Sequence, residues 1–371
     1  MSGSRRRRPS ELYIGLMSGT SLDGVDAALV DLRTRRPLLL GTAFVPYPKA
    51  LKSALLALQA SSRDELHRAS LAGSRLSGLY ATAARRLLRK CRVEPRFVRA
   101  IGCHGQTVRH RPEFGYTVQL GNPAALSERL GIPVVADFRS ADIAAGGQGA
   151  PLVPAFHAAV FRSARVHRVI VNLGGIANLT DLPRRGPVRG FDIGPGNVLL
   201  DAWIGRRLGR DFDHSGRLAS RGQPLQPLLR DLLADPYFRR SPPKSTGRDH
   251  FNLAWLRPFG VARHRAEDVQ ATLAELTARS IGSAIARFCY GVREVYLCGG
   301  GERNSDLVRR IARTLPGVPV ASTLQLGIHP DWVEAMAFAW LAQRRVKGKV
   351  GNLPEVTGAR NTRVLGAMYA A

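Results

Sequence analysis

The 371-residue sequence is poor in cysteine: it has four, and no two of them form a Cys-x-x-Cys pair. The spacing of Cys91, Cys103, Cys289 and Cys298 argues against a structural zinc site and a disulfide scaffold, and it fits a reduced, cytoplasmic compartment. No apolar run approaches the roughly 18 residues that a membrane-spanning helix requires, so we expect no membrane span. No apolar segment follows the basic N-terminal residues, so we expect no secretory signal.

Acidic residues are also scarce, since 28 Asp and Glu face 55 Lys and Arg and the formal net charge is +27. A positive field of this size attracts polyanions, including nucleotides and nucleic acids. The one basic run, Arg5–Arg8, lies in residues 1–10, which we expect to form a disordered arm. No zinc-finger spacing, RNP-type motif or basic stripe with interleaved aromatics accompanies it. We therefore interpret the scattered arginines as a solvated surface and do not expect nucleic acid to be the main partner.

The length and the order of the predicted elements indicate two lobes, because one hydrophobic core rarely keeps growing in a chain this long. Each half begins with a strand, a glycine-bearing polar turn and two further strands, and then alternates helices with strands. The predicted opening strands span residues 12–16, 25–32 and 38–45 in the first half, and 166–172, 179–182 and 188–193 in the second. This duplication is typical of the α/β, two-lobed actin/hexokinase-like (ribonuclease H-like) fold, in which the lobes surround an ATP and sugar cleft.

The sharpest change in composition falls at residues 146–151, which read Gly-Gly-Gln-Gly-Ala-Pro. We therefore predict an N-terminal lobe of residues 11–145 plus 353–371 and a C-terminal lobe of residues 146–352. Apolar periodicity predicts the main helices over residues 49–58, 63–90, 123–130, 197–208, 223–234, 268–288, 304–315 and 331–344.

The first turn has the composition of a phosphate-binding loop, although it is neither a Walker A loop nor a GxGxxG fingerprint. Glycines allow the backbone to approach an anion, and hydroxyl groups donate to phosphate oxygens. Asp23 is a hard oxygen ligand suited to Mg²⁺. A hairpin turn without any ligand has the same composition. The candidate residues are Gly19, Thr20, Ser21, Leu22, Asp23, Gly24, Val25 and Asp26.

Three loops of the second half are further candidates for holding ATP. A single glycine turn is common and is weak evidence for a ligand. A second turn at the corresponding place of the other lobe favours phosphate binding, because two such turns are required to clamp the phosphates. The loop after residue 193 runs into a helix, whose N-terminus favours anions. The loop after residue 298 would suit adenosine or be a tight strand-to-helix turn. The candidates are Gly174, Gly175 and Asn178, then Gly194, Gly196 and Asn197, and finally Gly299, Gly300, Gly301 and Asn304.

Asp192 is the candidate catalytic base. It ends an apolar strand between Phe191 and Ile193, just before Gly194. A carboxylate with apolar neighbours tends to have a raised pKa, which suits a general base. The alternative is an aspartate that only caps the following turn.

Polar side chains of the first half form a candidate sugar site. His104, Gln106 and Thr107 leave a strand together and offer a fixed set of donors and acceptors. Arg139 could grip a substrate carboxylate or pair with Asp137 or Asp142. A Cys103–His104 nucleophilic pair is disfavoured because adjacent strand residues point to opposite faces.

One acidic residue of the last predicted helix belongs to the same candidate site. Glu334 is the acid on an otherwise apolar helix, so it is either paired in the core or reaches a ligand.

Several motifs, in order along the chain from about Tyr13 to the C-terminus, resemble the anhydro-N-acetylmuramic acid kinase family. They are GTSLDGVD (19–26), GCHGQTVRHRP (102–112), GIPVVADFRSADIAAGGQGAP (131–151), NLGGIAN (172–178), GFDIGPGN (190–197), PKSTGRDHFN (243–252), CGGGERN (298–304) and EAMAFAWLA (334–342). Cys103 and His250 depart from the residues that the family pattern leads us to expect, and the arginine-rich arm is additional.

The resemblance implies an ATP- and Mg²⁺-dependent sugar kinase. Such an enzyme would convert 1,6-anhydro-N-acetylmuramic acid, with water opening the anhydro ring, to N-acetylmuramic acid 6-phosphate and ADP in peptidoglycan recycling. It further implies that residues 19–26 bind ATP and that Asp192 takes the proton from the attacking water. His104, Gln106, Thr107, Arg139 and Glu334 would hold the amino sugar.

Two rival functions remain open from the sequence, a kinase of the same fold with another substrate and a nucleic-acid-binding protein. The sequence also leaves open whether the chain forms a homodimer.

Overall fold

The computed structural model describes residues 11–19 and 21–371, which form two compact units. Unit 1 comprises residues 11–149, 334–352 and 359–371, and unit 2 comprises residues 150–333 and 353–358. The predicted N-terminal arm, residues 1–10, and the candidate Thr20 lie outside the described residues.

Unit 1 is built on a six-stranded sheet in the order β13-β7-β4-β1-β2-β3. β1 pairs antiparallel with β2 and parallel with β4. The strands are β1 (Leu12–Met17), β2 (Gly24–Asp31), β3 (Leu38–Pro46), β4 (Val98–Cys103), β7 (Val134–Ala136) and β13 (Ala367–Tyr369), with β5 (Gln106–Arg111) and β6 (Tyr116–Leu120) as a separate hairpin. The helices are α1 (Lys49–Ala57), α2 (Glu65–Cys91), α3 (Pro123–Leu130), α4 (Ser140–Ala144) and α12 (Val333–Val346).

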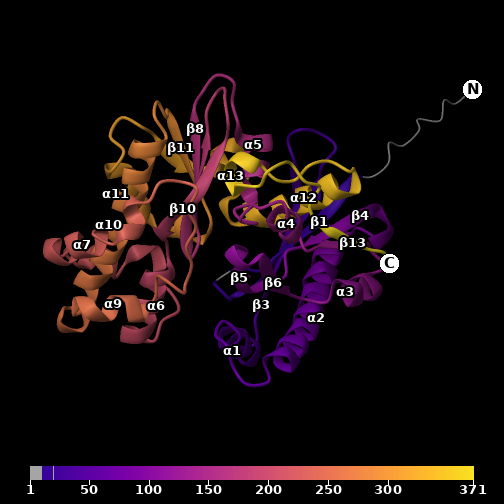
Figure 1. Cartoon of the computed structure of the whole chain (residues 1–371), viewed down its shortest axis with the longest axis horizontal. Helices are drawn as coiled ribbons and strands as arrows, with labels where there is room; N and C mark the ends of the chain where they lie inside the picture. Colours follow the sequence, from indigo (N-terminus) through magenta and orange to yellow (C-terminus); the bar gives the residue numbers. More distant parts are fainter. Residues whose placement is uncertain (1–10, 20) are drawn as a thin grey trace, which may run out of the picture. The chain divides into compact units, whose positions relative to one another are not determined.

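Two helices enclose the unit 1 sheet, one on each face. Ile14 and Leu16 point into a core that the apolar side of α2 completes, and α2 is the long helix along the sheet in Figure 1. Gly15, between them, points the other way, and a Cβ there would overlap the carbonyl oxygen of Ala335 in α12. This close approach explains why the position is glycine.

Unit 2 has a five-stranded sheet in the order β10-β9-β8-β11-β12. The strands are β8 (Arg168–Leu173), β9 (Ile176–Leu182), β10 (Arg189–Pro195), β11 (Glu294–Cys298) and β12 (Val320–Ser322). The helices are α5 (Val153–Phe161), α6 (Val198–Leu208), α7 (Gln226–Leu233), α8 (Pro236–Arg239), α9 (Leu253–Leu256), α10 (Ala266–Phe288), α11 (Ser305–Arg313) and α13 (Pro354–Thr357). The core of the unit lies on the sheet face covered by α10 (Figure 1).

The two sheets have the same plan. In unit 2, β8 pairs antiparallel with β9 and parallel with β11, as β1 does with β2 and β4 in unit 1. β9 pairs antiparallel with β10, as β2 does with β3. Each unit has its own hydrophobic core. The predicted duplicated two-lobed α/β fold is therefore confirmed.

The unit boundaries differ from the predicted lobes in one main respect. We assigned residues 331–344 to the C-terminal lobe, but α12 from Glu334 onward belongs to unit 1. The reason is contact with the first sheet, since a Cβ on Gly15 or Gly102 would overlap α12 backbone. Conversely, residues 353–358 belong to unit 2, where α13 packs on β10.

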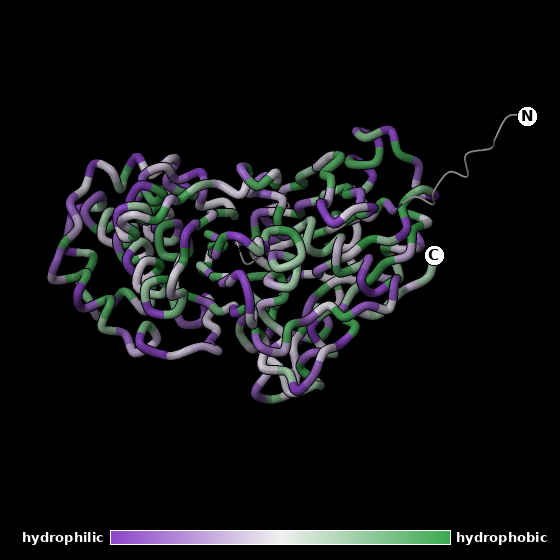
Figure 2. Tube along the Cα trace, turned by 90° about the horizontal axis from the view of Figure 1, so that it is seen from above, coloured by the Kyte–Doolittle hydropathy of each residue, from purple (hydrophilic) through white to green (hydrophobic). Residues whose placement is uncertain are grey.

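Within the described part of the chain, no helix is long and apolar enough to span a membrane. Hydrophilic and hydrophobic residues alternate over short stretches along the trace (Figure 2).

Candidate active site

The loop between β1 and β2 is anchored at its start and exposed at its tip. The Ser18 hydroxyl donates to the Gly105 carbonyl at 3.0 Å, so the Tyr80 hydroxyl must be the donor in its 2.7 Å contact with Ser18. At the tip, the Ser21 hydroxyl donates to Asp23 Oδ1 at 2.9 Å, and both side chains are exposed. This geometry leaves the Asp23 carboxylate accessible to a cation.

Three other predicted residues of this loop, Leu22, Gly24 and Val25, present no exposed side chain to a ligand. The side chains of Leu22 and Val25 are buried in the unit 1 core, and Gly24 packs against Val45 of β3. Leu22 has a φ of 55°, which is left-handed backbone that a leucine rarely adopts. Asp26 lies in β2 opposite Met17 and is half-buried.

His104 links this loop to Arg139. Its Nδ1 lies 3.2 Å from the Ser18 carbonyl oxygen, which can only accept, so Nδ1 carries the proton. Its Nε2 then accepts from the Arg139 guanidinium at 2.7 Å. Burial, and then the positive charge of Arg139, lower the pKa of His104 to about 3. The imidazole is thus a neutral strut that orients Arg139.

Arg139 is held by two hydrogen-bond acceptors. It donates to His104 Nε2 and, at 2.8 Å, to the Gly149 carbonyl oxygen. The Asp142 carboxylate accepts from the N–H of the same Gly149.

The disfavoured role of Cys103 as a nucleophile can be judged from its surroundings. Cys103 is buried, which raises the pKa of its thiol to about 12. Such a thiol is not a nucleophile at neutral pH.

Gln106 is held beneath the loop. Its amide oxygen accepts from the Tyr47 hydroxyl at 3.1 Å and its amide nitrogen donates to the Gly19 carbonyl at 3.2 Å. Thr107, its neighbour in β5, accepts from Gln119 at 3.2 Å. Gln106 therefore helps to position the loop, and its role in sugar recognition stays a prediction.

Glu334 lies in the first turn of α12 and is half-buried. In the same helix, the Phe338 ring packs on the His104 imidazole with centroids 4.7 Å apart. Unit 1 thus brings the loop, His104 and Arg139 together through hydrogen bonds, and α12 supports His104 from one side.

In unit 2, Asp192 lies on the sheet face opposite the α10 core. Its strand neighbours Phe191 and Ile193 point into that core, so the Asp192 side chain points away from it. Asp192 pairs with Asn178 of β9, which pairs with Asn172 of β8. Directly paired residues share a face, so an acid and two amides form a polar row across the sheet.

The segment after α8 holds Asp192 along the edge of β10. The N–H of Thr246 donates to Asp192 Oδ2 at 3.0 Å, and the N–H of Asp192 donates to the Lys244 carbonyl at 3.1 Å. The Tyr237 hydroxyl donates to the Asp192 carbonyl at 2.8 Å. Burial, and then the nearby charge of Asp192, raise the pKa of this Tyr237 hydroxyl.

The prediction that the N-terminus of α6 offers its N–H groups to an anion is wrong for three of them. The N–H of Asn197 donates to the Gly174 carbonyl, and those of Gly196 and Val198 donate to the Gly175 carbonyl, at 2.9 to 3.0 Å. A Cβ on Gly196 would overlap the Gly174 oxygen. These residues therefore brace the Gly174–Gly175 turn.

The loop at Gly299, Gly300 and Gly301 is the tight strand-to-helix turn that we considered as an alternative. Gly299 has a φ of 81°, and a Cβ there or on Gly301 would collide with the end of β8. Asn304 caps α11 by accepting from the Leu307 N–H at 3.0 Å. Gly300 alone of the three meets open space, so it is the one whose backbone a ligand could approach.

Sequence analysis missed several residues that position the candidate groups, among them Tyr80, Asn172, Lys244 and Thr246. Three of these four lie in motifs already noted, NLGGIAN and PKSTGRDHFN. The motif PKSTGRDHFN has neither strand nor helix periodicity, and this was the available signal that it has another role. Only the tertiary structure shows that residues 244–246 run beside Asp192.

Comparisons with known proteins bear on the whole chain. The structure is similar to an activator of 2-hydroxyisocaproyl-CoA dehydratase from Clostridium difficile, with a TM-score of 0.47, 12% identity, and coverage of 91% of this chain and 96% of the other. The protein called anhydro-N-acetylmuramic acid kinase from Nitrosomonas europaea is 52% identical over 97% of this chain and 99% of its own length. The protein of the same name from Thiobacillus denitrificans is 54% identical over 98% of both.

The profile of the family described as anhydro-N-acetylmuramic acid kinase matches residues 11–371. The match covers both units and every candidate residue. The chain therefore belongs to the anhydro-N-acetylmuramic acid kinase family.

Proposed function

We propose that this protein uses ATP to phosphorylate 1,6-anhydro-N-acetylmuramic acid while water opens the anhydro ring. The products are N-acetylmuramic acid 6-phosphate and ADP, as expected in peptidoglycan recycling in the cytoplasm. Family membership supports the reaction class, and the relatives that are more than 50% identical carry the name of this kinase. The observation that carries the mechanism is the placement of Asp192 opposite Asn178, on the sheet face that points away from the core of unit 2.

Asp192 acts as the general base in this proposal. It accepts a proton from the water that attacks the anomeric carbon, the bond to the bridging oxygen breaks, and the electron pair passes to the sugar 6-oxygen. That oxygen attacks the terminal phosphorus of ATP, and ADP leaves. The hydrogen bond from Thr246 fixes the carboxylate, and a fixed base lowers the entropic cost of reaching the transition state.

The unit 1 residues bind and orient the substrates. The loop at residues 19–26 holds phosphates through its backbone N–H groups. Arg139, oriented by neutral His104, grips the carboxylate of the sugar, because a guanidinium matches a carboxylate in geometry and charge. Glu334 and Thr107 contribute further contacts with the sugar.

Mg²⁺ would be held by Asp23, whose exposed carboxylate is a hard oxygen ligand. The described residues contain no group of three or more His, Cys, Asp or Glu placed to hold a metal ion. Mg²⁺ requires few protein ligands when substrate phosphates and water complete its coordination shell. When bound, the ion neutralises phosphate charge during transfer.

The test is sugar-dependent ADP formation with ATP, Mg²⁺ and the anhydro sugar. Asp192→Asn should lower kcat by about 10³-fold, because a general base contributes roughly 10² to 10⁴. Asp211→Asn, a matched change at an exposed acid of unit 2, should have no effect. ATP binding by Asp192→Asn should be unchanged. Equal activity of the two variants would contradict the proposal, and activity only with another sugar would point to a different substrate.

A further inference from the structure

Unit 2 contains a cavity that the proposed reaction does not use. It has a volume of about 560 Å³ and lies along the C-terminal half of α10. We call it the α10 groove and define it by four cationic lining residues, Arg239, Lys244, Arg279 and Arg287. No acidic residue lines it.

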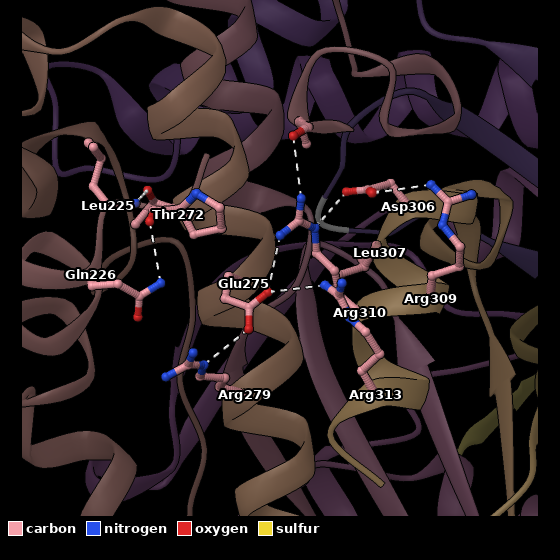
Figure 3. A network of polar contacts seen from close by, with 12 residues as sticks. Leu225, Gln226, Thr272, Glu275, Arg279, Asp306, Leu307, Arg309, Arg310 and Arg313 are labelled. Atoms are coloured by element: carbon pink, nitrogen blue, oxygen red, sulfur yellow. Dashed lines mark hydrogen bonds and ion pairs between the residues drawn. The ribbon is translucent and has the colours of Figure 1, made fainter. Parts of the chain in front are cut away.

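The charge of the α10 groove is largely uncompensated. Within the described residues, no ion pair involves Arg239, Lys244 or Arg287. Arg279 pairs with Glu275 at 3.0 Å, but that carboxylate also serves Arg310 at 3.1 Å and Arg313 at 3.7 Å (Figure 3). Arg310 pairs with Asp306 as well, and Glu275 is the one acid that pairs with a lining cation, so the four lining cations keep a net positive charge.

Two of the cations, Lys244 and Arg287, are held in place without an anion. Lys244 Nζ lies 4.7 Å from the centre of the Tyr237 ring and donates to the Tyr237 carbonyl at 3.3 Å. Arg287 donates to the Arg239 carbonyl at 3.0 Å, and its guanidinium lies over the Phe288 ring at 4.9 Å. Burial, then repulsion by Arg287 and Arg240, lower the pKa of Lys244 to about 8, against the opposing effect of Asp192. A bound anion would stabilise the charged form of a lysine that is under such repulsion.

The groove is separate from the candidate active site. Ile193 lines it, whereas Asp192 points to the opposite face of the sheet because neighbouring strand residues alternate. Lys244 contributes its side chain to the groove and its carbonyl to Asp192, whereas within the described residues neither Arg239 nor Arg287 makes a hydrogen bond to β10.

We propose that the α10 groove binds a phosphate monoester of a sugar-sized molecule. A phosphate monoester carries between one and two negative charges and three strong acceptor oxygens, which suits several converging cations better than a single carboxylate does. Arginine forks bind phosphate oxygens in pairs, and lysine adds a point charge. Apolar lining residues, among them Phe238 and Phe288, offer a surface for the body of the molecule. The volume lies in the range of small-molecule sites.

The test measures binding of glucose 6-phosphate to the full chain by calorimetry, with no ATP present. The parent protein should bind it, and glucose, which lacks the phosphate, should not compete. Arg287→Ala and Arg239→Ala should each weaken binding by roughly tenfold, since each removes a charged hydrogen-bond donor. Arg309→Ala removes the same charge from α11 outside the groove, and it should leave the affinity unchanged.

The outcomes separate this site from the proposed kinase activity. Binding that survives in Asp192→Asn but weakens in Arg287→Ala supports the groove whether or not the chain turns over its sugar. The proposal is overturned if glucose 6-phosphate fails to bind. It is also overturned if Arg287→Ala and Arg309→Ala bind it as tightly as the parent, because the phosphate would then lie elsewhere. Equal melting temperatures of the variants confirm that each is folded.

Discussion

The two units share one strand order but differ in the turn that follows their first strand. In unit 1 the turn has six residues, 18–23, and its tip is exposed at Ser21 and Asp23. In unit 2 it has two residues, Gly174 and Gly175, whose carbonyls accept three hydrogen bonds from the start of α6. The same topology therefore supports an open turn in one unit and a braced turn in the other.

The third strands differ even more. β10 carries Asp192 and is held along its edge by Lys244 and Thr246. β3 has no acidic residue and exposes Leu38 (58%) and Phe44 (44%) instead. The duplicated fold thus repeats its backbone plan, because both sheets must pair their strands by hydrogen bonds and pack one face against a hydrophobic core. Its chemistry need not repeat, because a single side chain supplies it.

The largest effect that we expect comes from adding one methyl group in the unit 1 turn and one in the segment that braces the unit 2 turn. Gly196→Ala should lower the free energy of unfolding by about 3 kcal/mol, because its Cβ would overlap the Gly174 oxygen and the brace must shift. Gly19→Ala should change it by less than about 0.5 kcal/mol, because the nearest atom to its Cβ, Ser21 Oγ, lies at 3.7 Å. Urea denaturation measures both, and equal losses would mean that the two turns are equally constrained.

A smaller effect should appear on acidification of unit 2. Burial lowers the pKa of His157 to about 3, whereas in the unfolded chain it titrates near 6.5. Between pH 6.5 and about pH 3, His157 is protonated in the unfolded state but not in the folded state. The free energy of unfolding therefore decreases as the pH is lowered through this range. At pH 5 this loss is about 2 kcal/mol.

His157→Gln should therefore reduce the loss of stability between pH 7.5 and pH 5 by about that amount. His67→Gln, at an exposed position in α2 of unit 1, should leave the loss unchanged. Urea denaturation at the two pH values gives the comparison. If both variants behave alike, burial of His157 is not what makes unit 2 sensitive to acid.

The smallest effect should follow from loss of the hydrogen bond between the Thr246 N–H and the Asp192 carboxylate. Thr246→Pro removes the N–H that donates to Asp192 Oδ2, so the base loses its orientation and kcat should fall about tenfold, with the KM for ATP unchanged. Thr246→Ala keeps this N–H and should retain kcat. A parallel fall in both variants would assign the effect to the threonine side chain, and a rise in the KM for ATP would indicate damage to the nucleotide site.

Sequence analysis located the strands and helices that carry strong periodicity, including the long helices α2 and α10 and all three opening strands of each unit. It missed β5, β12, β13, α4, α5, α8, α9 and α13. Seven of these eight have six residues or fewer, and periodicity has little meaning over so few positions. For the candidate site, it proposed Asp192, His104 and Arg139 from residue type and position, and these roles stay predictions. It could not predict their hydrogen-bond partners.

The sequence by itself determined the two-lobed organisation, the three opening strands of each unit and the resemblance to the family, because alternating hydrophobicity and long motifs in register are local properties of the chain. Tertiary structure alone decided that α12 joins unit 1, that His104 is a neutral strut for Arg139, and that the start of α6 braces a turn. Each of these depends on contacts between residues far apart in the chain. Such contacts follow from packing and hydrogen bonding in three dimensions, which no local pattern encodes.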